Sequence, residues 1–208
     1  MKKNVVAIVL FVLAGFISGC ATGRNTVLDP TLAYQARPDK ALVILMRPSS
    51  FGAAISSAVF DATGDHNELI AVLGPKEKVA YYCPPGDRLF MVIAENADFM
   101  EATLEAGKIY YGIVTPRMGV WKARFSLHPF KVNHAEQEFR LDSSNLKEWL
   151  TACHFVTPNA DAVKYGQEKA FDIQERRADY TARWASMSEN DKQWRRLLPA
   201  DGVSAPIR

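Results

Sequence analysis

Short apolar or alternating stretches follow one another between residues 40 and 130, and this pattern limits the choice of fold more than any other feature. The stretches cover residues 41–46, 58–60, 69–73, 78–83, 88–95, 99–105, 109–115 and 121–130. Turn-forming residues separate several of them, and no helical pattern intervenes, as a parallel α/β sheet would require. We therefore predict about eight strands that form an antiparallel β-sandwich or open barrel.

Helical patterns follow the expected strands. Residues 146–153 predict a short helix capped by Ser143 or Ser144, and the charged segment 161–187 predicts a longer one. A sequence typical of a capped last helix begins at Ser188. The expected class is therefore α+β, with two or three C-terminal helices after the strands.

The N-terminus has the layout of a secretory signal. Lys2 and Lys3 precede an apolar run at residues 5–16, and two small residues then lead to Cys20. The run is shorter than the roughly 20 apolar residues that a membrane-spanning helix needs. We therefore predict a signal peptide at residues 1–19 and export of the rest of the chain.

Residues 17–20 (Ile-Ser-Gly-Cys) also resemble the lipobox of bacterial lipoproteins. The resemblance implies a diacylglyceryl group on the Cys20 sulfur, cleavage after Gly19 and acylation, for example with palmitate, of the new amino group. Several acyl chains would hold the protein on a bilayer, its first expected partner. Ala21 in place of aspartate implies the outer membrane facing the periplasm. The alternatives are an ordinary cleaved signal or a short buried helix.

The rest of the chain divides by pattern into three parts. Residues 20–39 lack sustained periodicity and contain two prolines, so we expect a lipidated cysteine and a tether with a mean reach of roughly 25 Å. Residues 40–132 form the expected β domain. Residues 133–208 form the expected helical C-terminal extension.

The charge balance argues against nucleic acid as a partner. The chain has 25 Lys+Arg and 23 Asp+Glu, and removal of Lys2 and Lys3 with the signal leaves 23 of each (25 − 2 = 23). A protein without a basic excess lacks the electrostatic footprint of nucleic-acid binding. The expected partners are therefore the bilayer and an envelope protein or glycan.

If Cys20 carries lipid, Cys83 and Cys153 form an even pair in an oxidising compartment. A disulfide between them is then one hypothesis, and it would contribute roughly 4 kcal/mol in the chain-entropy model. Two separate buried thiols are the alternative. A redox-responsive stress or signalling module that uses this pair is a third reading of the function.

Parts of the expected β domain resemble an uncharacterised family of bacterial envelope lipoproteins. The similar segments are Arg-Pro-Ser-Ser-Phe-Gly at residues 47–52, Pro-Pro-Gly at residues 84–86 and Leu-Glu-Ala-Gly-Lys-Ile-Tyr-Tyr at residues 104–111. The similarity covers about residues 40–130. No activity is established for the family, so the resemblance implies a β domain and an envelope location, with no catalytic residues to transfer.

Catalytic and metal-binding motifs are weak throughout the sequence. His134-Ala135-Glu136 matches a fragment of the zinc-deaminase motif but lacks the Pro-Cys-x-x-Cys that must follow it. Cys83 precedes two prolines, a position that suits packing better than a reactive thiol. We therefore expect no catalytic, cofactor-binding or metal-ligating residues.

A binding surface is the remaining candidate site. Neighbouring residues of a strand point to opposite faces, so each tyrosine pair places one ring outward, where it could line a groove for a glycan or peptide. The candidates are Arg47, Ser49, Tyr81, Tyr82, Tyr110 and Tyr111; cross-strand packing is their alternative role. The sequence thus predicts a non-catalytic binding or structural role in the envelope. An envelope hydrolase or transferase with a site assembled from distant residues is the alternative.

Overall fold

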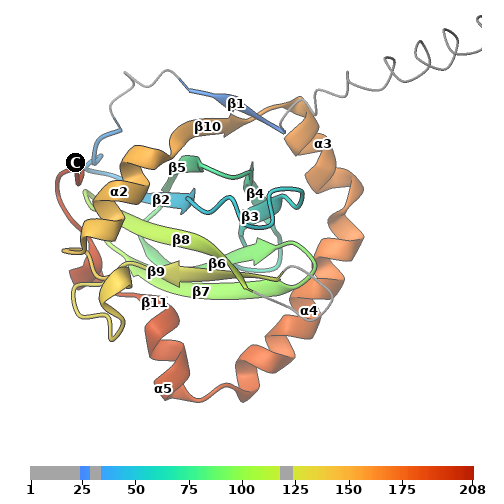
Figure 1. The fold of residues 1–208 in the computed structure, drawn as a ribbon. Helices are drawn as coiled ribbons and strands as arrows, with labels where there is room; N and C mark the ends of the chain where they lie inside the picture. Colours follow the sequence, from blue (N-terminus) through green and yellow to red (C-terminus); the bar gives the residue numbers. More distant parts are fainter. Residues whose placement is uncertain (1–23, 29–33, 118–123) are drawn as a thin grey trace, which may run out of the picture.

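The computed structural model describes residues 24–28, 34–117 and 124–208. Within these residues, eleven strands form two mixed sheets that lie face to face, and three of the four α-helices cover their outer surfaces (Figure 1). The sheets are not closed into a barrel. The predicted α+β class and the β-sandwich are therefore confirmed.

The first sheet has six strands. Their order is β1 (Asn25–Val27), β10 (His154–Pro158), β5 (Glu77–Cys83), β2 (Ala41–Arg47), β8 (Ile109–Arg117) and β9 (Arg124–Pro129). The pairs β10–β5 and β2–β8 are parallel, and the others are antiparallel.

The second sheet has five strands. Their order is β11 (Arg196–Leu197), β7 (Ala97–Leu104), β6 (Gly86–Ile93), β3 (Ser57–Asp61) and β4 (Glu68–Leu73). Only β11–β7 is parallel in this sheet. Strands β2–β9 correspond to the eight stretches that the sequence pattern predicts, although Trp121, in the last stretch, lies outside the described residues.

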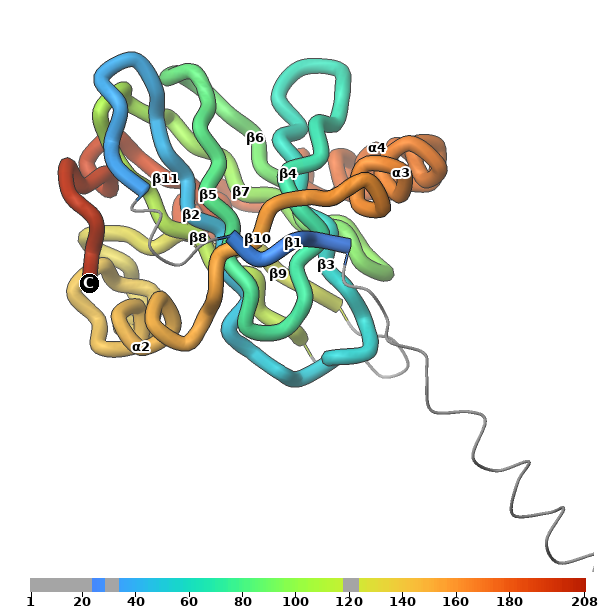
Figure 2. The backbone as a smooth tube through the Cα atoms, turned by 90° about the horizontal axis from the view of Figure 1, so that it is seen from above, coloured from blue at the N-terminus to red at the C-terminus, as the bar shows by residue number. Residues whose placement is uncertain are grey.

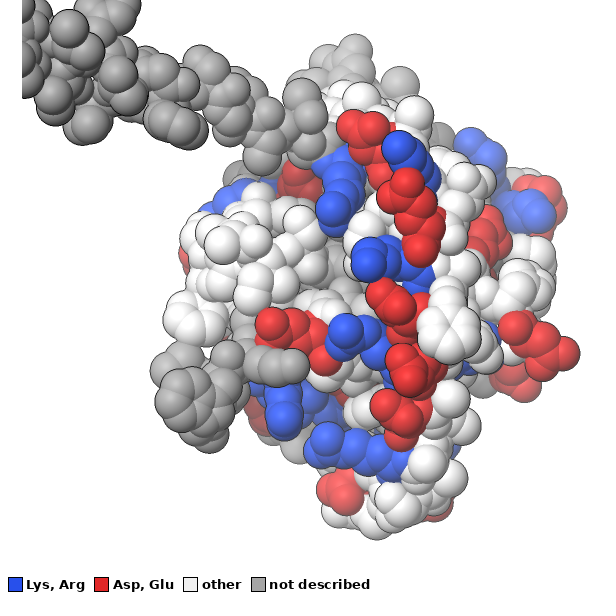
Figure 3. Space-filling model, turned by 90° about the vertical axis from the view of Figure 1, so that its right-hand side faces the viewer, with Lys and Arg blue, Asp and Glu red and all other residues white. Residues whose placement is uncertain are grey.

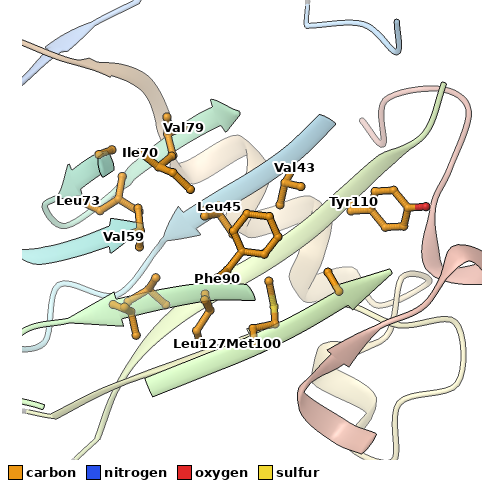
Figure 4. Packing of buried hydrophobic residues seen from close by; sticks show 14 of the residues in the cluster. Val43, Leu45, Val59, Ile70, Leu73, Val79, Phe90, Met100, Tyr110 and Leu127 are labelled. Atoms are coloured by element: carbon orange, nitrogen blue, oxygen red, sulfur yellow. The ribbon is translucent and has the colours of Figure 1, made fainter. Parts of the chain in front are cut away.

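The central core lies between the two sheets (Figure 4). In β2 the odd-numbered residues 41–45 face this core, and the even-numbered residues 42–46 face outward, as strand geometry requires. Both sets are fully buried, because a helix covers the outer face as well. This explains why β2 reads as a continuous apolar run rather than an alternating one.

Helices cover both outer faces and make four layers. Helix α2 (Ser144–Ala152) packs on the six-stranded sheet through Leu146 and Leu150. Helices α3 (Ala160–Glu168) and α4 (Ala170–Ser186) cover the five-stranded sheet, and Tyr180 and Trp184 of α4 pack edge-on against Phe99. Each aromatic residue buries a large apolar area, so these three rings fasten α4 to the sheet.

Short helices complete the C-terminal region: η2 (Gln137–Phe139), α5 (Glu189–Lys192), η3 (Gln193–Arg195) and η4 (Pro199–Asp201). Two predicted caps are present. The Ser143 side chain accepts a hydrogen bond from the Leu146 amide at 3.2 Å, and Ser188 accepts one from Asp191 at 3.1 Å. Each bond satisfies an amide that has no partner within its helix.

The sheets include segments from outside the predicted β domain (Figure 2). Strands β10 and β11 come from the expected helical extension, and β1 comes from the expected tether. Residues 25–27 join the sheet through main-chain pairing with β10 rather than through burial of apolar side chains. For this reason a hydrophobic pattern could not reveal them.

The predicted signal peptide and Cys20 lie outside the described residues. In the part of the chain that is described, no helix combines the length and the apolar character needed to cross a membrane.

Candidate functional site

A fully buried carboxylate, Asp98 of β7, lies where four other elements meet this strand. The Tyr180 hydroxyl of α4 and the Arg195 guanidinium of η3 both donate hydrogen bonds to its Oδ1 atom. The Leu127 amide of β9 donates to Oδ2 at 3.2 Å, and Arg117 Nη2 of β8 lies 3.6 Å from the same atom. We call Asp98, Arg117, Tyr180 and Arg195 the Asp98 cluster.

Electrostatics explains why the cluster is complete. A buried carboxylate is strongly unfavourable unless charges and hydrogen bonds compensate it. Burial lowers the pKa of Arg195, but the charge and the hydrogen bond of Asp98, together with Tyr180 and Asp191, raise it, so the pKa is raised overall. Burial and the nearby Asp98 both raise the pKa of Tyr180, which keeps its hydroxyl as a neutral donor. The cluster therefore holds α4 and η3 in fixed positions on the sandwich.

Beside this cluster lies a cleft of about 850 Å³, which we call the α4 cleft. Its lining residues are Glu95, Asn96, Ala97, Arg117, Arg124, Asp172, Glu175, Arg176, Asp179, Tyr180 and Arg183. Figure 3 shows acidic and basic side chains gathered on this face of the molecule. Arg117 and Tyr180 belong to both the cleft and the Asp98 cluster, so the cluster fixes part of the cleft wall.

Several charges in the α4 cleft are unpaired among the described residues. Arg124, Glu175 and Asp179 form no ion pair there, and Arg183 only lies over the Tyr180 ring, with its guanidinium carbon 5.9 Å from the ring centre. Such groups remain available to a bound molecule. The cleft can therefore pair with a ligand that carries both signs of charge.

A smaller groove of about 450 Å³, which we call the α2 groove, opens on the other outer face. Its lining residues are Pro48, Ser49, Ser50, Lys76, Ile113, Val114, Thr115, Glu138, Phe139 and Trp149. Aromatic rings and hydroxyl groups thus lie side by side, a composition suited to a sugar or a short peptide. Of the predicted binding residues, only Ser49 lines this groove.

A third hollow, of about 580 Å³, lies between Arg177 and Arg196. Arg177 already donates to the carbonyls of Ala62 and Gly64, at 2.8 and 2.6 Å, and Arg196 pairs with Glu101 at 2.6 Å. Both arginines are therefore committed to internal contacts, and this hollow has fewer free groups than the α4 cleft.

Arg47, predicted at a binding surface, has no exposed area. Its guanidinium donates to the carbonyls of Ile55 at 2.6 Å, Gly52 at 2.8 Å and Leu73 at 3.1 Å. It also lies over the Phe125 ring at 4.5 Å. Burial lowers its pKa to about 10, against the opposing effect of Glu77. Arg47 therefore holds the loop after β2 in place and cannot contact a ligand directly.

The tyrosines also differ from the prediction. Tyr110 and Tyr111 are fully buried, and their hydroxyls accept hydrogen bonds from the amides of Glu105 and Ile207, each at 2.9 Å. Their rings lie in the central core and in the outer core beneath α2, respectively. Tyr110 points into the sandwich and Tyr111 points to its outer face, but both rings are packed. The outer face, which the alternating pattern predicts to be exposed, is covered by α2.

Tyr81 and Tyr82 are half-buried. The Tyr81 hydroxyl donates to Asp61 at 3.1 Å, and the Tyr82 hydroxyl donates to the Gln35 carbonyl at 2.9 Å. Arg37 covers the Tyr82 ring at 3.9 Å. These internal contacts occupy the groups that a binding surface would use.

Cys83 and Cys153 are separate, free and buried thiols, so of the two alternatives the structure favours the unbridged pair over the disulfide. Cys83 packs in the central core, whereas Cys153 packs beneath α2, on the opposite face of the same sheet. Burial raises the pKa of both thiols to about 11. The sheet between them excludes a bridge, and neither thiol is suited to act as a nucleophile or a redox switch.

His128 and His134 serve packing. His128 stacks on Phe139 with the ring centres 4.8 Å apart, and burial lowers its pKa to about 4. His134 accepts a hydrogen bond from the Glu136 amide at 3.0 Å, so the His-Ala-Glu segment forms a local turn. No group of three or more His, Cys, Asp or Glu residues that could hold a metal ion occurs among the described residues.

No protein-family model matches the chain, and no curated protein matches it. The lipobox and the similarity to envelope lipoproteins therefore stay predictions from the sequence.

Proposed function

We propose that this protein is a lipid-anchored component of the bacterial envelope that binds a charged segment of another envelope protein in the α4 cleft. The N-terminal signal pattern and Cys20 support the anchor, and Ala21 favours the outer membrane facing the periplasm. The role is one of binding, with no chemical step.

The observation that carries the binding proposal is the set of unpaired charges in the α4 cleft. Arg124 and Arg183 face a ligand together with Glu175 and Asp179, in a volume within the usual range for binding sites. A neutral glycan would leave these charges unpaired, whereas a peptide segment with acidic and basic residues would satisfy them. The partner class is therefore a protein.

Crosslinking in intact cells followed by purification of the protein tests this proposal. The double variant Arg124→Ala/Arg183→Ala removes two free cations, and Lys147→Ala, at an exposed position of α2 on the other outer face, is the control. We expect the control to retain the crosslinked envelope protein and the double variant to lose about tenfold or more, a difference of roughly 1.4 kcal/mol. Equal recovery from both variants would refute the α4 cleft as the binding site.

Labelling cells with radioactive palmitate tests the anchor separately. We expect label in the unmodified protein and none in Cys20→Ser, which should leave the membrane fraction. Retention of Cys20→Ser on the membrane, or no label in the unmodified protein, would refute the lipid anchor.

The α2 groove supports a second candidate, the binding of an envelope glycan. Trp149 and Phe139 offer apolar rings beside the hydroxyl of Ser49. Titration calorimetry with soluble peptidoglycan fragments should then give a signal that Trp149→Ala abolishes and Trp194→Ala preserves. A signal that survives Trp149→Ala would exclude this groove.

A further inference from the structure

The first strand begins very close to the proposed anchor. Only residues 21–24 separate Cys20 from the start of β1 at Asn25. The five residue steps from Cys20 to Asn25 span at most about 18 Å when fully extended. A lipid on Cys20 would therefore hold the start of β1 within a short distance of the bilayer, unlike the longer tether that the sequence pattern predicts.

Strand β1 is fixed to the body of the protein. It pairs with β10 from Asn25↔Pro158 to Val27↔Val156. The Asn25 side chain donates to the Val72 carbonyl, and to Glu77 Oε2 at 3.2 Å, and it accepts from the Val72 amide at 3.3 Å. The strand that follows the anchor therefore cannot pivot freely on the sandwich.

A further contact lies just before β1. The Arg24 guanidinium lies over the ring of Tyr165 in α3, 4.4 Å from its centre. Strands β1 and β10 and helix α3 thus form one edge of the molecule, and α5 lies at the opposite end (Figure 1).

We infer that the edge formed by β1, β10 and α3 is the surface that lies against the lipid headgroups. This inference rests on the proposed anchor at Cys20. Because the connection is short and β1 is clamped, the edge stays near the bilayer and the α5 end points away from it. Figure 3 keeps this edge at the top, so the α4 cleft opens to the side, where a partner can reach it.

The composition of this edge is compatible with headgroups. Val27 and Val163 expose 65% and 49% of their surface. The hydroxyls of Thr26 and Thr157 lie 2.7 Å apart, and Lys164 pairs with Glu168 at 3.6 Å. A surface that alternates apolar and polar side chains suits the boundary between lipid headgroups and acyl chains, where apolar groups contact the chains and polar groups stay hydrated.

Photocrosslinking to vesicles tests the orientation. The chain from Cys20 onward contains every described residue, and its Cys20 thiol can be coupled to a maleimide lipid while Cys83 and Cys153 stay buried. The vesicles contain phosphatidylcholine, phosphatidylglycerol and a lipid with a photoactivatable headgroup. Mass spectrometry of the crosslinked peptides should find lipid on β1, β10 and α3, about tenfold above the level on α5.

A longer connection is the matched control. Insertion of fifteen Gly and Ser residues between Gly23 and Arg24 lengthens the connection from 4 to 19 residues and should reduce these crosslinks about tenfold, since effective concentration falls roughly as the −3/2 power of length. The same insertion after Arg208 should change nothing. Equal labelling of both ends, or labelling of the edge that the first insertion leaves unchanged, would overturn the inference. Coupling puts residue 20 at the bilayer in every case, so the palmitate experiment alone decides the anchor.

Discussion

Arg47 and Asp98 are both fully buried charges, but the structure compensates them in opposite ways. Arg47 donates to main-chain carbonyls, most of them in the loop that directly follows its own strand. Asp98 accepts from side chains of α4 and η3, which lie 82 and 97 residues away along the chain. One charge therefore organises a local loop, and the other joins distant elements and shapes the α4 cleft.

This difference has an energetic consequence. Carbonyl partners carry no net charge, and an opened loop can return them to water. The partners of Asp98 include Arg195, a charge that stays largely buried when its counterpart is removed. Removal of one member of a buried ion pair is costly because the other is left uncompensated. We therefore expect the Asp98 cluster to be the more sensitive of the two.

The largest effect should come from Asp98→Ala. The variant leaves Arg195 without its carboxylate and should reduce the free energy of unfolding by about 4 kcal/mol, measured by urea denaturation. Asp142→Ala is the control, because Asp142 pairs with Arg140 at an exposed site and should cost at most about 0.5 kcal/mol. A loss below 1 kcal/mol for Asp98→Ala would break the comparison.

The second largest effect should be a dependence of stability on pH that arises beside the Asp98 cluster and not at Arg47. His128 neighbours the Asp98 cluster; burial lowers its pKa to about 4, as do Arg195 and Arg117, while Asp98 opposes them. The His128 ring binds a proton more tightly in the unfolded chain than in the folded protein. The free energy of unfolding is therefore highest above pH 6.5 and falls by about 3 kcal/mol as the pH drops to 4.

The control for this titration is His128→Gln, which removes the titrating ring. Urea denaturation at several pH values should show that the variant loses about 3 kcal/mol less than the unmodified protein between pH 6.5 and 4. The carbonyl partners of Arg47 do not titrate, so Arg47 variants should keep the pH dependence of the unmodified protein. Identical pH profiles for His128→Gln and the unmodified protein would contradict the assignment.

Arg47→Met should have a smaller effect. It removes hydrogen bonds to three carbonyls but keeps much of the side-chain volume, so we expect a loss of about 2 kcal/mol. The loop at residues 48–56 should become sensitive to proteolysis, whereas cleavage elsewhere should not change. A loss as large as that of Asp98→Ala, without local cleavage, would show that the two charges act alike.

The smallest effect should come from reductant. Because Cys83 and Cys153 are free thiols on opposite faces of one sheet, a reducing agent should leave the melting temperature unchanged. Both thiols should react with a thiol reagent only after denaturant is added. A mass lower by two hydrogens, restored by reductant, would contradict this arrangement.

The contrast between the local contacts of Arg47 and the long-range contacts of Asp98 also explains which features the sequence predicts. The eight strands β2–β9 follow from local periodicity, and Ser143 and Ser188 signal helix caps within three residues of their partners. The loop that Arg47 holds in place directly follows Arg47 in the sequence, so this contact is also local. The role of Asp98 depends on Tyr180 and Arg195, and no local pattern connects these distant residues with an aspartate near the start of β7.

Apart from Ser49, the predicted binding surface is wrong for a related reason. Alternation along β8 separates Tyr110 from Tyr111 correctly, but it cannot show that α2 covers the outer face. Strands β1 and β11 are short and pair mainly through their backbones, so their side chains carry little signal. The sequence does not reveal the α4 cleft, because its charges resemble an ordinary solvated helix face until the sheet is placed beside them.

The order of strands along the chain has a consequence for how the protein folds. Thr26 of β1 meets Thr157 of β10, 131 residues later, and β11 ends only at Leu197. Pairings between such distant residues form slowly, because the closure of a long loop must precede any stabilising contact. A chain still being synthesised can therefore assemble the centre of the sandwich, and its last quarter must emerge before β1 and β11, one outer strand of each sheet, find their places.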